Sequence, residues 1–75
     1  MYTGVTLVLK VKYTKHAREQ MIARGISETE VEEGINKGAK RLQHPDKIIF
    51  AYRYYEIVSK KVGDVYFVIT VQSRW

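Results

Sequence analysis

The sequence predicts an α+β fold in which two N-terminal helices pack on one face of a mainly antiparallel, four- to five-stranded sheet. The evidence is an alternating stretch near the N-terminus, a pair of short helical segments with start and stop signals, and a second half with period-two apolar residues. The expected element order is β-α-α-β-β-β, with room for one more strand. At 75 residues, the chain is expected to form a single domain, residues 1–75.

The first element is expected to be a half-buried strand over residues 5–13. Apolar and polar side chains alternate in this stretch, which is typical of a strand with one face on the core. The side chains on the core side are Val5, Leu7, Leu9, Val11 and Tyr13.

The next two elements are expected to be short helices joined at Gly25. Thr14 is a suitable N-cap for a helix over residues 17–24, and glycine commonly follows the last residue of a helix. The second helix begins with a capping box, in which Ser27 accepts from a backbone amide and Glu30 reaches back to the serine. Its core face is expected to contain Val31, Gly34, Ile35 and Gly38.

Two faces of the first helix are candidates for the packed side. One face contains His16, Ala17, Gln20, Met21 and Arg24. The other contains Ala17, Arg18, Met21, Ile22 and Gly25. Both direct Ala17 and Met21 inward, and periodicity favours the second face because it is more apolar.

The second half is expected to be β-rich. Residues 40–43 are expected to form a short strand that ends in a turn. Residues 47–60 contain no Gly, Pro or Asn, so they form either one long bent strand or two strands that reverse near residues 52–54, and we favour two. A hairpin at residues 62–64 then leads into the last strand, residues 64–74.

Alternation in the last strand predicts which side chains face the core. The inward residues are expected to be Val65, Phe67, Ile69 and Val71. The outward residues are expected to be Tyr66, Thr70, Gln72 and Arg74, with Val68 as an exception to the pattern.

The chain is basic, with 13 Lys and Arg residues, eight Asp and Glu residues and a net charge of +5. Four of the eight acids lie within residues 28–33, where a helix N-terminus favours them. The rest of the chain therefore has 13 basic residues against four acids. This distribution predicts a face that attracts polyanions, although a charge-rich soluble surface explains it equally well.

Composition also excludes some kinds of site. The absence of cysteine excludes disulfides and thiolate metal sites, and His16 and His44 are the only histidines, so neither a metal nor another cofactor is expected. No run reaches the roughly 18 apolar residues of a membrane span, and the first residues lack a signal-peptide pattern, so we expect a cytoplasmic protein without membrane association. Because a short chain buries a modest core, weak homodimerisation is a further expectation.

Residues 16–27 carry the motif His-Ala-x-x-(Arg/Gln)-Met-x-x-Arg-Gly-Ile-Ser, which resembles the start of the small DUF4258 domains. The matching residues are His16, Ala17, Gln20, Met21, Arg24, Gly25, Ile26 and Ser27. These domains are similar in turn to the RelE/ParE toxin superfamily, and the sheet-rich second half, with Val-Ile-Thr-Val at residues 68–71, fits that resemblance. The resemblance favours the helix face that contains His16 and Arg24.

The resemblance implies a RelE/ParE-like, toxin-type protein: a metal-free endoribonuclease (mRNA interferase) that cuts RNA, often ribosome-bound mRNA, and is neutralised by a small acidic antitoxin. Such cleavage needs a base for the ribose 2′-hydroxyl, a proton donor for the leaving oxygen, and cations for the phosphate. The alternative is a non-catalytic module of the same fold that binds nucleic acid or protein.

The candidate catalytic residues are His16, Arg24, Arg53 and Arg74. His16 is the side chain near the motif that titrates around neutrality, and its place at the start of a helix favours the neutral imidazole. The arginines are fixed cations that can hold a phosphate through two hydrogen bonds. Each also has a structural interpretation, as a local hydrogen-bonding histidine, a helix-dipole partner or a cation–π contact.

Six further residues are candidates for nucleic-acid contact. They are Lys10, Lys12, Lys15, Arg18, Tyr54 and Tyr66. The basic residues would contact phosphates, and the tyrosines would stack on bases, a contact typically worth about 1–3 kcal/mol.

Overall fold

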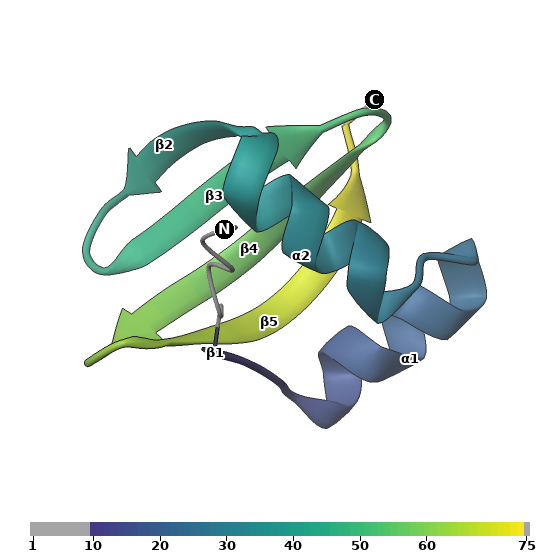
Figure 1. Ribbon diagram of the computed structural model, residues 1–75, viewed down its shortest axis with the longest axis horizontal. Helices are drawn as coiled ribbons and strands as arrows, with labels where there is room; N and C mark the ends of the chain where they lie inside the picture. The colour runs from purple at the N-terminus through teal and green to yellow at the C-terminus, as the bar shows by residue number, and fades with distance from the viewer. Residues whose placement is uncertain (1–9, 75) are drawn as a thin grey trace, which may run out of the picture.

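The computed structural model describes residues 10–74, with two helices on one face of a five-stranded sheet (Figure 1). The helices are α1 (Lys15–Arg24) and α2 (Glu28–Lys37). The strands are β1 (Lys10–Tyr13), β2 (Ala39–Gln43), β3 (Lys47–Tyr52), β4 (Tyr55–Val62) and β5 (Val65–Ser73). The predicted α+β class is confirmed, and the element order is the expected β-α-α-β-β-β with the one further strand. The earlier part of the predicted first strand, residues 5–9, lies outside the described residues.

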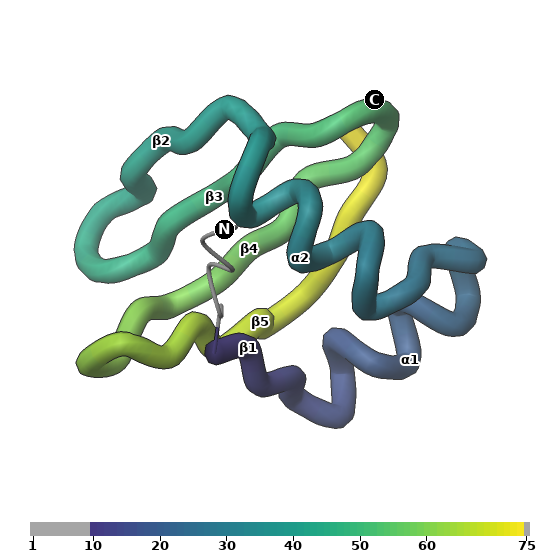
Figure 2. The backbone as a smooth tube through the Cα atoms, viewed as in Figure 1, coloured from purple at the N-terminus to yellow at the C-terminus, as the bar shows by residue number. Residues whose placement is uncertain are grey.

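The sheet is mixed, with the spatial order β1-β5-β4-β3-β2. The strands β2 to β5 follow one another through hairpins and pair antiparallel. By contrast, β1 pairs in parallel with β5, with Lys10 opposite Val65 and Tyr13 opposite Val68. Figure 2 shows that the chain leaves β1 through both helices and enters β2 at the opposite edge, so no hairpin joins β1 to its neighbour β5. The sheet is therefore not purely antiparallel.

The long β-rich segment forms two strands, as predicted. The strand β3 ends at Tyr52 and β4 begins at Tyr55, so Arg53 and Tyr54 make the turn. Arg53 adopts a positive φ of 54°, the left-handed conformation that short hairpin turns require. Because Gly or Asn usually fills such a position, the composition of the segment did not mark the turn.

The helix boundaries follow the predicted local signals. The Thr14 side chain accepts from the Ala17 amide, and Gly25 ends α1 with a φ of 68°. At the start of α2, Ser27 and Glu30 form both hydrogen bonds of the capping box. These contacts satisfy backbone amides that the first turn of a helix leaves without partners.

Helix α1 packs with Ala17 and Met21 inward, at 0% and 5% exposure. Arg24 lies on the same side, because its Nε donates to the Val71 carbonyl of β5 at 3.2 Å. Ile22 is 81% exposed, so the more apolar face that periodicity favoured is not the packed one. The helix is short and lies beside β5, so its packing follows the tertiary position of β5 rather than its own weak apolar pattern.

A β-bulge interrupts the pairing of β4 with β5. Val58 pairs with Thr70 and the next residue, Ser59, pairs with Val68. Ile69 is therefore the extra residue on β5. An extra residue shifts the alternation by one position. Side chains before the bulge therefore point to the face opposite to the one that strict alternation from the residues after it predicts.

The bulge overturns part of the predicted orientation of β5. Val68 and Val71 are both fully buried in the core beneath the helices, and Tyr66 packs against the same core. The predicted inward orientation is therefore correct for Val71. It is wrong for Val65, Phe67 and Ile69, which alternate to the other face. Tyr66, predicted to point away from the core, contacts it.

The core lies between the helices and the central strands. Its fully buried members include Ala17, Val31, Tyr55, Ile57, Val68 and Val71. The Tyr55 hydroxyl donates to the Glu30 carbonyl at 3.1 Å, which ties β4 to α2. Helix α2 approaches the sheet closely at Gly34, where an added Cβ would overlap Ile57 Cδ1. The helices are thereby held on one face of the sheet. Among the described strands, β1 and β2 form the two edges.

Candidate nucleic-acid interface

Charge is divided unequally between the two layers of the fold. The strands and their turns contain nine of the 13 basic residues but only three of the eight acids. The helical layer contains the other four basic residues and the other five acids. The sheet layer is therefore strongly positive, and a polyanion would be attracted to that layer.

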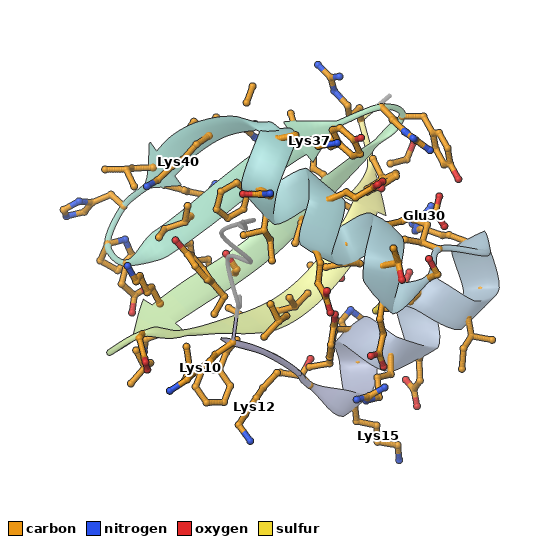
Figure 3. All side chains as sticks on the ribbon, in the orientation of Figure 1. Lys10, Lys12, Lys15, Glu30, Lys37 and Lys40 are labelled. Carbon is orange, nitrogen blue, oxygen red and sulfur yellow. The ribbon has the colours of Figure 1, made fainter. Side chains whose placement is uncertain are left out.

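Three lysines, called here the edge lysines, lie at the β1 edge: Lys10, Lys12 and Lys15. Val11 and Tyr13 of β1 pack against the core, so alternation places Lys10 and Lys12 on the other side of the strand. Lys15 is the first residue of α1. Figure 3 shows all three side chains extending outward along the same edge. The structure thus brings together residues that the sequence predicted to contact phosphate.

The edge lysines differ in their ion pairs. Lys10 Nζ lies 2.9 Å from Asp64 Oδ2, and both side chains are exposed. Within residues 10–74, Lys12 and Lys15 make no ion pair. No local pattern marks Asp64 as a partner of Lys10, because that contact depends on the parallel pairing of β1 with β5. Lys12 and Lys15 are consequently the edge cations whose charge is least compensated.

Arg18 lies next to this edge but has protein partners. Its Nη1 donates to Glu28 Oε2 at 2.7 Å, and its Cζ lies 4.9 Å from the centre of the Tyr13 ring. Burial, with smaller contributions from Glu28 and Glu32, raises the pKa of Tyr13 to about 12. The Tyr13 phenol therefore stays neutral, and Arg18 would have to give up its pair with Glu28 to contact a phosphate fully.

Arg53 and Arg74 meet at the β3–β4 turn. Arg74 Nη1 donates to the Arg53 carbonyl at 2.9 Å, and the Arg74 amide donates to the Tyr54 carbonyl at 3.1 Å. The Arg53 guanidinium lies 3.8 Å from a carboxylate oxygen of Glu30 and 3.9 Å from one of Glu33. The acids of α2 therefore partly balance the charge of Arg53.

His16 is not part of this arginine pair. It is an exposed residue in the first turn of α1, whereas Arg24 is the last residue of the same helix. Eight residues of helix separate them, a rise of about 12 Å. The four candidate catalytic residues are thus divided between the two ends of α1 and the β3–β4 turn.

The two candidate stacking tyrosines lie in different environments. Tyr54 is 48% exposed, and its ring meets the Tyr55 ring edge-on at 5.2 Å. Tyr66 packs against the core, with Phe50 at 5.8 Å and Lys61 Nζ at 5.4 Å from its ring centre. Tyr54 is therefore the more accessible of the two for stacking on a base.

Glu56 links three strands on the sheet face away from the helices. Its carboxylate accepts from both Nη atoms of Arg41, at 2.9 and 3.4 Å, and from Gln72 Nε2 at 3.2 Å. These hydrogen bonds, first that of Arg41 and then that of Gln72, hold the pKa of Glu56 below its usual value. The sequence did not indicate this contact, because it joins β2, β4 and β5.

The lowered pKa predicts a pH-dependent stability. Ionised Glu56 contributes stability above the ordinary carboxyl pKa of about 4.3, and this contribution is lost as pH falls through the lower folded-state value. We expect Glu56→Gln to cost roughly 0.5–1 kcal/mol at pH 7 and to flatten the loss of unfolding free energy below about pH 4.5. Urea unfolding at a series of pH values checks this prediction. The control is Glu19→Gln, at an exposed position of α1. An unchanged acid limb in Glu56→Gln would contradict it.

The described part of the chain contains neither a metal-binding cluster nor a membrane-spanning helix. Residues 10–74 contain no group of three or more His, Asp or Glu side chains arranged to hold a metal ion. No helix in this part of the chain has the length and apolar character needed to cross a membrane.

Fold and surface define a small α+β domain with a basic edge strand. The DUF4258 family, described as a domain of unknown function, matches residues 13–72. The chain belongs to the DUF4258 family, as the motif at residues 16–27 predicted. No curated protein and no solved structure matches the chain significantly.

Proposed function

We propose that this DUF4258 protein is a nucleic-acid-binding module that holds single-stranded RNA along the edge lysines without cleaving it. The main support for this proposal is the exposed row of Lys10, Lys12 and Lys15, next to a sheet layer that is rich in basic residues. A row of cations can follow one phosphate backbone without reading its sequence. Tyr54 lies at a different turn, so stacking on it is not required for this contact.

A second candidate is the metal-free endoribonuclease of the RelE/ParE type, neutralised by a small acidic antitoxin. The Arg74 guanidinium, held against the Arg53 carbonyl at this turn, favours it, since a guanidinium group can stabilise charge on a phosphate. The order of the elements also supports placing the domain in the RelE/ParE-like superfamily. In this candidate His16 would have to act from the start of α1, about 12 Å along the helix from Arg24.

One experiment separates the two candidates. The protein is mixed with an unstructured, fluorescently labelled RNA in the presence of EDTA, anisotropy is measured at about 50 and 200 mM salt, and the RNA is then run on a denaturing gel. Two phosphate contacts, from Lys12 and Lys15, predict at least about a sevenfold loss of affinity between these salt concentrations, since each contributes about 0.7 to the slope for single strands. The RNA is expected to stay intact.

The other outcomes have distinct meanings. Absence of binding at the lower salt concentration would overturn the proposed RNA-binding function. Cleavage that disappears in both Arg53→Ala and Arg74→Ala, with the circular dichroism of the fold retained, would establish the ribonuclease instead.

A further inference from the structure

We propose that the outer edge of β2 is a docking site for an extended acidic segment of a partner protein, which pairs with β2 as an added strand. This site lies at the opposite edge of the sheet from the edge lysines. It is independent of the proposed RNA contact.

The strand β2 offers a backbone that is free to pair. All five of its residues, Ala39–Gln43, are exposed, and among the described strands it pairs only with β3. An edge strand presents a row of backbone N–H and C=O groups, which an extended peptide can satisfy by strand addition.

The charge around this edge selects an acidic partner. Lys40 on β2 and Lys37 at the end of α2 are exposed, and neither makes an ion pair within residues 10–74. Figure 3 shows both on the far side of the molecule from the edge lysines. The β2 register pairs Lys40 with Phe50, so Lys40 lies on the helix side of the strand, whereas Glu56 holds Arg41 on the other face. An incoming strand with carboxylates on the helix side would meet lysines without acidic partners.

An apolar contact accompanies the charge. Leu42 is 77% exposed and lies on the same side of β2 as Lys40. It borders a hollow of about 280 Å³ at the β2–β3 hairpin, lined also by His44, Pro45 and Ile48. An apolar side chain of the added strand can fill this hollow, which would fix the register of the pairing.

The same charges argue against a second copy of this chain as the occupant. Antiparallel pairing of β2 with its own copy over all five residues would place Arg41 opposite its counterpart. Like charges directly opposite one another destabilise a strand pair, and edge lysines in general oppose self-association of sheets. The edge therefore discriminates between its own copy and an acidic strand.

The test uses a ten-residue peptide in which every second residue is alternately glutamate or valine and threonine fills the positions between, so that glutamate and valine share one face of the strand. The control peptide has lysine in place of glutamate. Binding is followed by backbone amide NMR shifts of the isotope-labelled protein. The acidic peptide is expected to shift the β2 amides, and the lysine peptide is expected to have no effect. Leu42→Glu should weaken binding by about tenfold or more, because it removes the apolar contact and adds repulsion.

Matched variants locate the site. Ile22→Glu introduces the same change at a similarly exposed apolar residue on α1 and should bind as the wild type does. Lys12→Glu with Lys15→Glu should also leave peptide binding unchanged, so failure of the RNA proposal and of this one are distinguishable. No shift of the β2 amides at about millimolar peptide, equal weakening by Ile22→Glu, or dimerisation of the protein through β2 would each overturn the proposal.

Discussion

Ile57→Ala is expected to lower the free energy of unfolding by about 3–4 kcal/mol, a large effect for the truncation of a single aliphatic side chain. Ile57 is fully buried in the middle of β4, between Phe50 on β3 and Val71 on β5. Its Cδ1 lies beneath Gly34, where α2 approaches the sheet most closely. The truncation therefore opens a cavity between two layers that cannot easily close.

A loss of this size is a large part of the total stability of so small a domain. Typical values predict roughly 4–11 kcal/mol for a chain of this length. Urea unfolding followed by circular dichroism measures the difference. Val62→Ala is the matched control, because Val62 ends the same strand at 52% exposure and should change stability by less than about 0.5 kcal/mol. Similar, small losses in both variants would contradict the described core.

The features that the sequence predicted well are those encoded by neighbouring residues. The cap at Thr14, the left-handed Gly25 and the capping box of Ser27 and Glu30 each depend on contacts within three or four residues. The division of residues 47–60 into two strands was also predicted, whereas the position of the turn was not fixed by the residues of that segment.

The features that the sequence did not predict depend on distant partners. The bulge at Ile69 arises from the register of β5 on β4, and it reversed the expected faces of Tyr66 and Phe67. The parallel pairing of β1 with β5 likewise leaves no periodic signal in either strand. The face of α1 was set by its contact with β5, and the exposed Ile22 shows that periodicity misled there.

In the candidate site too, contacts between neighbouring residues were easier to predict than contacts between distant ones. Lys10, Lys12 and Lys15, which were predicted as candidate phosphate contacts, are close in sequence and lie along one edge. Arg53 and Arg74 are 21 residues apart and meet only because β5 ends beside the β3–β4 turn. The separation of His16 from Arg24 follows from helix length, but the relation of either to the arginine pair required the fold.

The edge lysines are expected to account for most of the RNA affinity. Lys12→Glu combined with Lys15→Glu should weaken RNA binding by about tenfold or more, since two exposed phosphate contacts of up to about 1 kcal/mol each are lost and repulsion is added. The control is Lys37→Glu combined with Lys40→Glu, which changes the net charge of +5 by the same amount at the other edge. Four strand spacings, about 19 Å, separate the two edges.

Screening by salt allows the two double variants to be distinguished. At physiological salt the Debye length is about 8 Å, so charges at the β2 edge should have little effect on RNA held at β1. The most direct test of the account is therefore the RNA dissociation constant of the two double variants, measured side by side at about 150 mM salt. The β1-edge variant is expected to lose about tenfold or more in RNA affinity, and the β2-edge variant less than about threefold. Equal losses in both variants would show that RNA responds only to net charge, and would contradict a defined site at the edge lysines.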